Sequence, residues 1–418
     1  MLKQLIIITI FFLIAGVTVA QEGTTSPYSY YGIGTQKFKG TAENRAMGGI
    51  SVYSDSIHLN IQNPASTAGL KLVNYTVGAS YKSSTQKTDT ESQKTHTTSL
   101  DYLAIGIPMG KFGASFGLIP YTSVGYNIRS ETANDTTQFS GSGGLNKAFL
   151  ALGYQINPKF SVGVDVNYNF GNIENIAFTR ENNVQYGTRR VNKSDLLGFS
   201  FNLGAIYKTM VTDELELTTS LTYTPETNFT AENFREISSV LTSPGGNQVL
   251  IDSREIPQDN SDFTFPSQFT IGGGIGQPKN WFIGLEYTNQ KTSNFTNRTV
   301  PAEDMAFDVT FKNASKFRLG GFYIPNYNSL GNYTKRIVYR AGIRFEETGI
   351  NIREQDINEF GISFGVGLPV GRTFSNINLG VEVGRRGTKD FGLVQENFVN
   401  AFLSFSLNDK WFEKRYID

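Results

Sequence analysis

The chain has 418 residues, no cysteine, and 37 basic and 37 acidic side chains. A net charge of zero argues against a nucleic-acid-binding surface. The lack of cysteine excludes disulfides, thiolate metal ligands and cysteine nucleophiles. Only 39% of the residues are hydrophobic, whereas 13% are aromatic and 43 are glycine. This composition is unusual for a soluble chain of such length, which would gather its apolar residues into a core.

The first twenty residues predict a secretory signal peptide. Lys3 precedes an almost unbroken apolar run over Leu5–Val17, and the small residues Thr18 and Ala20 stand just before Gln21. This order of charge, apolar stretch and small residues is typical of a cleaved signal. The alternative is a membrane anchor, but the run falls short of the ~20 residues that a spanning helix needs. We therefore expect export, with residues 1–20 removed.

Beyond Gln21 the apolar residues alternate with polar ones. In Phe160–Phe170 every second residue is apolar, and the residues between them are small or polar. Such alternation predicts a strand with one apolar and one polar face. The same pattern recurs in Leu197–Tyr207, Leu215–Tyr223, Trp281–Tyr287, Ile337–Phe345, Phe360–Leu368, Ile377–Val383 and Val399–Leu407.

We predict fourteen strands, beginning near residues 72, 99, 112, 144, 160, 196, 214, 266, 281, 315, 337, 358, 376 and 396. The connections after even-numbered strands are tight. Those after odd-numbered strands are mostly long, and we expect loops over Ser83–Thr98, Gly171–Asp195, Pro225–Phe265 and Gln290–Ala314. Segments of about 9–12 residues and this parity are typical of membrane barrels. The sequence thus predicts an all-β fold, a transmembrane antiparallel β-barrel over residues 72–418, in the outer membrane of a Gram-negative bacterium.

Residues 21–71 do not alternate and precede the first strand. Several of them are apolar, among them Ile33, Met47 and Ile50, which disfavours a free tail in the periplasm. A lumen about fourteen strands wide also has to be filled if it is not to leak. We therefore expect this segment to fold into the lumen as a plug.

The same segment resembles a known family. A Gly48-Gly49 turn is followed by Asn63-Pro64-Ala65 just before the first strand. This order is similar to the FadL family of long-chain fatty-acid transporters. The resemblance implies a fourteen-stranded barrel, an N-terminal hatch in its lumen, and a hatch motif formed by Gly48, Gly49, Asn63, Pro64 and Ala65. The Ser26-Pro27-Tyr28-Ser29 start and the charged tail Asn408–Asp418 resemble members from Bacteroidota, whose substrates are diverse.

Charged residues on the polar faces form a candidate lumen network: Asp165, Glu286, Arg318, Arg340, Arg344 and Glu382. Because an unpaired charge is costly in a plugged lumen, we expect these groups to pair. Two interpretations remain open. The network either pins the plug to the wall or includes a site for the headgroup of a ligand.

The sequence offers little for catalysis. Of its two histidines, His58 falls in the plug segment and His96 in an outer loop, so neither a zinc site nor a hydrolase is expected. We predict no enzyme activity, no metal and no cofactor.

We expect passive uptake of hydrophobic compounds such as long-chain fatty acids. Four outer-loop residues are candidate ligand contacts: Phe229, Phe234, Phe263 and Phe265. The alternative is a non-transporting barrel subunit of an outer-membrane protein secretion or assembly complex. The expected partners are membrane lipids, a hydrophobic ligand and, in the second case, other envelope proteins.

Overall fold

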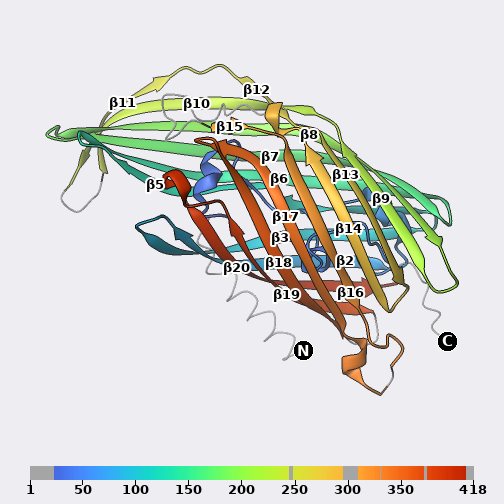
Figure 1. Ribbon diagram of the computed structural model, residues 1–418. Helices are drawn as coiled ribbons and strands as arrows, with labels where there is room; N and C mark the ends of the chain where they lie inside the picture. Colours follow the sequence, from blue (N-terminus) through green and yellow to red (C-terminus); the bar gives the residue numbers. More distant parts are fainter. Residues whose placement is uncertain (1–22, 244–247, 295–308, 330, 371–373, 411–418) are drawn as a thin grey trace, which may run out of the picture.

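The computed structural model describes residues 23–243, 248–294, 309–329, 331–370 and 374–410. The predicted signal peptide and the end of the charged tail lie outside these residues. The chain forms a closed antiparallel β-barrel (Figure 1). Its wall has fourteen strand positions, here called staves, each occupied by one strand or by two or three strands end to end. This confirms the fold and the strand number expected from the sequence. None of the described helices has the length and apolar character that crossing a membrane requires.

Several staves are interrupted and consist of more than one strand. In chain order the staves are β2 (Val73–Lys87), β3 (Ser92–Met109), β4 with β5 (Phe112–Pro120 and Thr122–Glu131), β6 (Asp135–Asn157), β7 (Phe160–Glu181), β8 (Tyr186–Met210), β9 with β10 (Glu216–Thr224 and Thr227–Thr242), β11 with β12 and β13 (Gln248–Ile256, Ser261–Phe265 and Gln268–Gln277), β14 (Trp281–Gln290), β15 with β16 (Val309–Phe311 and Ala314–Tyr323), β17 (Val338–Ile352), β18 (Gln355–Val370), β19 (Ser375–Arg386) and β20 (Gln395–Asp409).

Each stave pairs with its neighbours in sequence, and the first and last staves close the ring. Strands β2 and β20 pair from Val73 with Asp409 to Lys87 with Gln395. The short elements are η1 (Pro27–Tyr30), β1 (Thr35–Gln36), α2 (Ala42–Ala46), η2 (Pro64–Gly69), η3 (Thr292–Asn294), η5 (Tyr333–Arg336) and η6 (Asp390–Gly392). The first four precede the barrel strands and contact the wall, η1 and β1 at β5, α2 at β17 to β20, and η2 at β3, β4, β6, β7 and β8.

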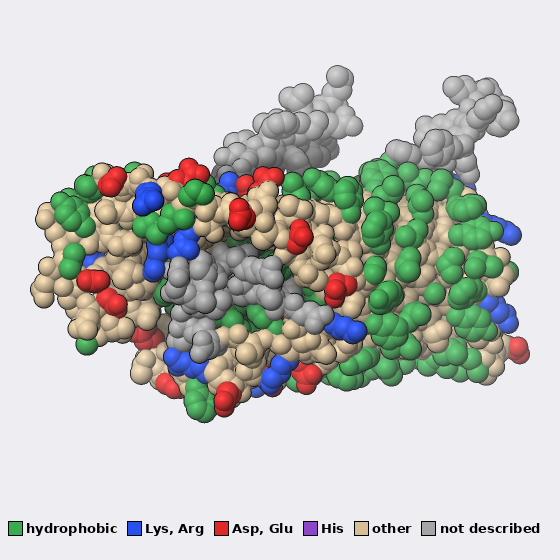
Figure 2. Space-filling view, turned by 90° about the horizontal axis from the view of Figure 1, so that it is seen from above, with side chains coloured by type: hydrophobic (Ala, Val, Ile, Leu, Met, Phe, Trp, Pro, Cys, Tyr) green, Lys and Arg blue, Asp and Glu red, His purple; other side chains and the backbone are tan. Residues whose placement is uncertain are grey.

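The barrel wall is apolar outside and polar inside. On β7, Val166 and Tyr168 are 39% and 40% exposed, whereas Asn167 between them is 2% exposed. A β-strand sends successive side chains to opposite faces, so this alternation puts the apolar set outward. Figure 2 shows the result on one face of the molecule, where apolar side chains cover one end of the barrel in a broad belt. This belt is the surface expected to face lipid.

The other half of the barrel corrects the predicted loops. Strands β6, β7 and β8 have 23, 22 and 25 residues, and β7 and β8 remain paired across most of the segment Gly171–Asp195 that we expected to be a loop. Likewise β2 and β3 extend through most of Ser83–Thr98, and β10 to β12 occupy most of Pro225–Phe265. The wall therefore continues beyond the apolar belt. There its outer face is polar, so the alternation that revealed the strands fades.

One seam of the wall is incomplete. Strand β3 pairs with β4 from Leu103–Leu118 to Met109–Phe112, but among the described residues no pairing joins β3 to β5. Strand β5 pairs instead with β6 and, at Thr122 and Ser123, with β1 of the N-terminal segment. Beyond Pro120, the third stave therefore pairs with the N-terminal segment inside the barrel and does not pair with its neighbour β3.

Candidate functional site

The candidate site is the lumen of the barrel. There the N-terminal segment, residues 23–71, contacts the wall on opposite sides. At the long-strand end, η1 and the residues after it pack into an apolar cluster with β5, β6, β7 and β10. Tyr30 is 2% exposed, and its ring lies edge-on to Tyr126 and Phe139, with centroids 5.0 and 5.8 Å away. Aromatic rings packed this closely fill the long-strand end of the lumen.

The Asn63-Pro64-Ala65 motif forms the start of η2. The Asn63 side chain accepts a hydrogen bond from Ala65 N at 3.1 Å, and Pro64 occupies the first turn, where no backbone donor is needed. The Asn63 amide also donates to Ala205 O of β8 at 3.4 Å. These contacts fix the motif against the wall. Whether it serves as a moving hatch stays a prediction.

Glycines in four adjacent wall strands make room for η2. A Cβ atom would come within 1.9 Å of Thr67 O at Gly113, 2.3 Å of Thr67 Oγ1 at Gly153, 2.5 Å of Ala65 N at Gly163 and 2.2 Å of Asn63 Oδ1 at Gly204. Real Cβ atoms do not approach so closely. We call Gly113, Gly153, Gly163 and Gly204 the first glycine floor.

A second glycine floor supports the end of α2. Gly320, Gly342 and Gly365 lie on β16, β17 and β18, and added Cβ atoms would meet Met47 O at 2.1 Å, Gly48 N at 2.1 Å and Ala46 Cβ at 2.6 Å. Gly48 and Gly49 have φ values of +68° and +89°, which favour glycine. Gly48 N donates to Ser363 Oγ of β18 at 2.9 Å. The N-terminal segment is thus seated on two floors of the wall.

Glu286 of β14 links this segment to the wall. One of its oxygens accepts hydrogen bonds from the nitrogen and the hydroxyl of Ser51, and the other pairs with Arg318 of β16 at 2.7 Å. Arg318 also donates to Gly49 O at 3.2 Å. Glu286 is 1% exposed. A buried carboxylate is tolerated when it is paired and hydrogen-bonded in this way.

Glu382 of β19 holds a second link. It pairs with Arg45 of α2 at 3.1 Å and with Arg344 of β17 at 2.5 Å. Arg45 also reaches Asp101 of β3 at 3.3 Å, and Arg344 continues to Glu359 of β18. This chain of charges connects α2 with strands on both sides of the β2–β20 seam.

The other two candidate lumen residues bind amides. Asp165 accepts hydrogen bonds from Asn167 and from Asn202, which in turn donates to Gln62 O at 3.3 Å. Arg340 donates to Asn378 Oδ1 at 3.0 Å, and the amide of Asn378 donates to Glu43 at 2.8 Å. Both residues therefore reach the N-terminal segment through a neutral side chain.

The four phenylalanines that the sequence suggested as ligand contacts are separated by the structure. Phe229, Phe263 and Phe265 are 1%, 3% and 4% exposed within the apolar cluster that contains Tyr30. Phe234 is 38% exposed and lies outside that cluster. Ligand contact at these residues stays a prediction, and for the first three it requires the cluster to open.

The incomplete seam is covered from inside by the start of the described chain. Thr25 Oγ1 donates to Thr95 Oγ1 of β3 at 2.8 Å, and Gly125 N of β5 donates to Ser29 Oγ at 3.1 Å. Thr35 and Gln36 then pair with β5 itself. The N-terminal segment thus bridges the two strands that do not pair with each other.

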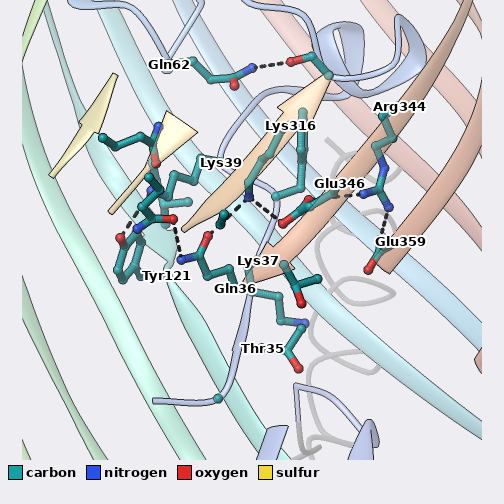
Figure 3. A pocket seen from close by; sticks show the side chains of 18 of the residues that line it. Thr35, Gln36, Lys37, Lys39, Gln62, Tyr121, Lys316, Arg344, Glu346 and Glu359 are labelled. Carbon is teal, nitrogen blue, oxygen red and sulfur yellow. Dashed lines mark hydrogen bonds and ion pairs between the residues drawn. The ribbon is translucent and has the colours of Figure 1, made fainter. Parts of the chain in front are cut away.

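Two of the cavities between the described residues are relevant to function. One, of about 270 Å³, lies between the N-terminal segment and the wall and is lined by Lys39, Tyr121, Lys316, Glu346 and many other polar residues (Figure 3). The other, of about 420 Å³, lies near the tight-turn end. It contains Asp55 and His58, whose carboxylate and ring nitrogen are 2.6 Å apart.

That pair is electrostatically coupled. Burial raises the pKa of Asp55, but the neighbouring His58 and the hydrogen bonds to the carboxylate outweigh this and lower it to about 2. Burial lowers the pKa of His58, and Asp55 more than offsets this, so the pKa of His58 is raised. Among the described residues, no group of three or more His, Cys, Asp or Glu side chains could hold a metal ion.

Sequence reasoning missed several lumen residues. Glu359 and Arg386 continue the inward-facing register of β18 and β19, so the alternation could have revealed them. Lys39, Arg45 and Ser51 belong to a segment without periodicity, and no sequence signal pointed to their partners.

Comparison with known proteins identifies the family of the chain. A sequence model of a family described as BamG matches residues 1–418. The chain belongs to the BamG family. None of the curated proteins searched matches it.

Among solved structures, the barrel is similar to the CymD monoaromatic hydrocarbon channel (TM-score 0.58, 11% identity, 91% of this chain and 100% of the other). It is also similar to the Pseudomonas putida toluene transporter TodX (0.56, 14%, 90% and 100%) and to a Pseudomonas aeruginosa FadL homologue (0.57, 11%, 91% and 100%). At these identities the likeness shows the fold, and the fold is the one that the Asn-Pro-Ala resemblance implied. This BamG-family chain therefore shares its barrel fold with these channels and with the FadL homologue.

Proposed function

We propose that this BamG-family chain is a non-transporting barrel subunit of an outer-membrane protein assembly or secretion complex. The observation that carries the proposal is the closure of the lumen. The N-terminal segment is held by two glycine floors, by Glu286 and by Glu382, and the apolar cluster around Tyr30 fills the long-strand end. The family name BamG points in the same direction.

The charge distribution supports a static role. Moving the N-terminal segment would leave Glu286 and Glu382 without some of their partners, and a buried charge that loses its partner costs about 3–5 kcal/mol. Nine basic and six acidic side chains are among the residues that line the 270 Å³ cavity, which disfavours the burial of an alkyl chain there. In this role the apolar belt faces the outer-membrane lipids or partner barrels, and the tight-turn end faces the periplasm.

Depletion of the protein tests this role. In a strain with a regulated copy, we expect other outer-membrane barrels to accumulate unfolded soon after depletion, as seen by loss of their heat-modifiable gel mobility. A tagged chain at its native level should co-purify with stoichiometric envelope proteins. Normal barrel folding, together with a chain that purifies alone, would contradict the proposal.

A second candidate function is passive uptake of hydrophobic compounds, as expected from the sequence. The incomplete seam between β3 and β5 favours it. A solute that leaves the lumen there could cross the wall without breaking hydrogen bonds between paired strands. The similar structures include channels for monoaromatic hydrocarbons and toluene. Uptake of labelled long-chain fatty acids and of toluene by a deletion strain, measured together with barrel folding in the same cells, distinguishes the two: uptake falls while the other barrels fold normally only if this barrel is a channel.

A further inference from the structure

The 270 Å³ cavity contains an excess of positive charge. Nine basic and six acidic side chains line it. Five of each form ion pairs with one another, among them Arg318 with Glu286 and Lys316 with Glu346. The remaining charged groups are Lys37, Lys39, Lys82, Lys147 and Asp165, and among the described residues none of these has an ion-pair partner within 4 Å.

Two of these lysines converge on one ring. Lys39 comes from the N-terminal segment and Lys147 from β6, and their ammonium groups lie 4.5 and 4.9 Å from the centroid of the Tyr121 ring. Lys39 also donates to Tyr121 Oη at 3.3 Å. Each ring contact contributes about 0.5–2 kcal/mol, which is less than the several kcal/mol that removing an unpaired ammonium group from water costs. Among the described residues, Asp165 is the one acidic side chain of the lining without an ion pair, but Asn167 and Asn202 already donate to it.

Unused neutral hydrogen-bonding groups line the same cavity. Gln290 is 1% exposed, and its oxygen accepts from Gln36 at 3.2 Å, but its side-chain nitrogen has no partner. The hydroxyl of Thr35 is also buried without one. A buried amide N–H that is left unsatisfied costs about 1–3 kcal/mol, so such groups point to a missing acceptor. A negatively charged hydrogen-bond acceptor would satisfy both the ammonium groups and the amide group.

We propose that this cavity is a binding site for a compact oxyanion, a phosphate, sulfate or small carboxylate group, held between Lys39 and Lys147. Lys39 belongs to the N-terminal segment and Lys147 to the wall, so the bound anion ties one to the other. Fifteen charged side chains line the cavity, which disfavours a buried acyl chain, so the proposed anion is a free solute rather than the headgroup of a lipid. The inference goes beyond the proposed function and holds for a subunit and for a channel alike.

Binding of inorganic phosphate to the full mature chain in detergent micelles tests the site. We expect one phosphate per chain by equilibrium dialysis, with binding weakened tenfold or more in Lys39→Met and in Lys147→Met. Phosphate should raise the thermal midpoint of the wild type by a few degrees over chloride at equal ionic strength. Lys335→Met is the matched control, because Lys335 is exposed on η5 and should leave phosphate binding unchanged.

Further variants keep the test decisive. Lys39→Arg with Lys147→Arg retains both charges and should still bind phosphate, even if a methionine variant folds poorly. The proposal is wrong if the wild type binds no phosphate. It is also wrong if the methionine variants bind as tightly as the wild type, or if oleate displaces phosphate, which would identify a lipid headgroup site.

Discussion

Ser51 donates two hydrogen bonds to a single oxygen of Glu286, one from its backbone nitrogen at 2.7 Å and one from its hydroxyl at 2.6 Å. Arg318 binds the other oxygen of the same carboxylate. Two of the three donors to Glu286 therefore come from the N-terminal segment. The wall carries a buried charge that is fully satisfied only when this segment is in place.

Glu286→Gln should accordingly destabilise the barrel. The substitution removes the charge opposite Arg318 and places an amide nitrogen among groups that already donate, so we expect a loss of about 3–5 kcal/mol in the free energy of unfolding. Urea unfolding followed by intrinsic fluorescence measures it. Glu214→Gln, in an exposed turn, is the control and should change little. Equal stabilities of the two variants would show that the Glu286 pair contributes nothing.

The glycine floors should tolerate no side chain. Gly163→Ala and Gly342→Ala each place a methyl group within 2.5 Å of the N-terminal segment, so we expect them to displace it or to cost about 1–3 kcal/mol. Gly273→Ala on β13 is the matched control, because no atom lies within 4 Å of its added Cβ. Limited proteolysis of the folded proteins should cut the N-terminal segment faster in the first two variants only. Identical cleavage in all three would rule out the floors as seats.

The Asp55–His58 pair predicts a pH dependence. The pKa of Asp55 is lowered from 3.8 to about 2, so its contribution to stability is present above pH 3.8 and is lost as the pH falls toward 2. The pKa of His58 is raised above 6.5, so its contribution is complete below pH 6.5 and is lost as the pH rises through the raised value. The pair therefore stabilises the fold most between about pH 4 and 6.5.

Asp55→Asn measures this effect. We expect it to cost about 2 kcal/mol at pH 5.5 and less as the pH rises and the imidazole of the wild type loses its proton. Thermal midpoints of both proteins from pH 5 to pH 9 provide the comparison. Glu43 and Arg340 act on His58 with opposite signs and are present in both proteins. A difference that does not vary with pH would mean that His58 stays uncharged.

A disulfide across the incomplete seam should separate the two proposed functions. Thr25→Cys with Thr95→Cys replaces two hydroxyls that are 2.8 Å apart, in a chain without other cysteines. Once oxidised, the bond fixes the N-terminal segment to β3. A complex subunit should remain fully active in this form, whereas a channel that releases its solute through the seam should lose uptake and regain it on reduction. The single Thr25→Cys variant controls for the substitution.

Much of the fold could be predicted from the sequence, because strands that face lipid must alternate apolar and polar residues. Within the belt, residues such as Val166 and Tyr168 are apolar at every second position, and each stave was located there. Beyond the belt that constraint ends. The paired segments Gly171–Glu181 of β7 and Tyr186–Asp195 of β8 consequently looked like a loop.

The lumen was less predictable. The inward position of Glu286 and Glu382 followed from strand register, and the Asn63-Pro64-Ala65 motif was evident from its place before the first strand. The partners of these residues could not be inferred, because Ser51, Arg45 and Lys39 lie in a segment whose path depends on contacts with distant strands. No periodicity in that segment specifies which wall residue each side chain meets.

The two glycine floors have a consequence for how the barrel is assembled. The N-terminal segment contacts strands from both the beginning and the end of the chain, and it precedes all of them in synthesis. Pairing β2 with β20 joins residues more than three hundred positions apart, which is entropically expensive for a free chain. A segment that already holds β3 through Asp101 and β19 through Glu382 brings the two edges together. We therefore expect the N-terminal segment to act as a template for closure of the barrel, so a chain that lacks it should stall as an open sheet.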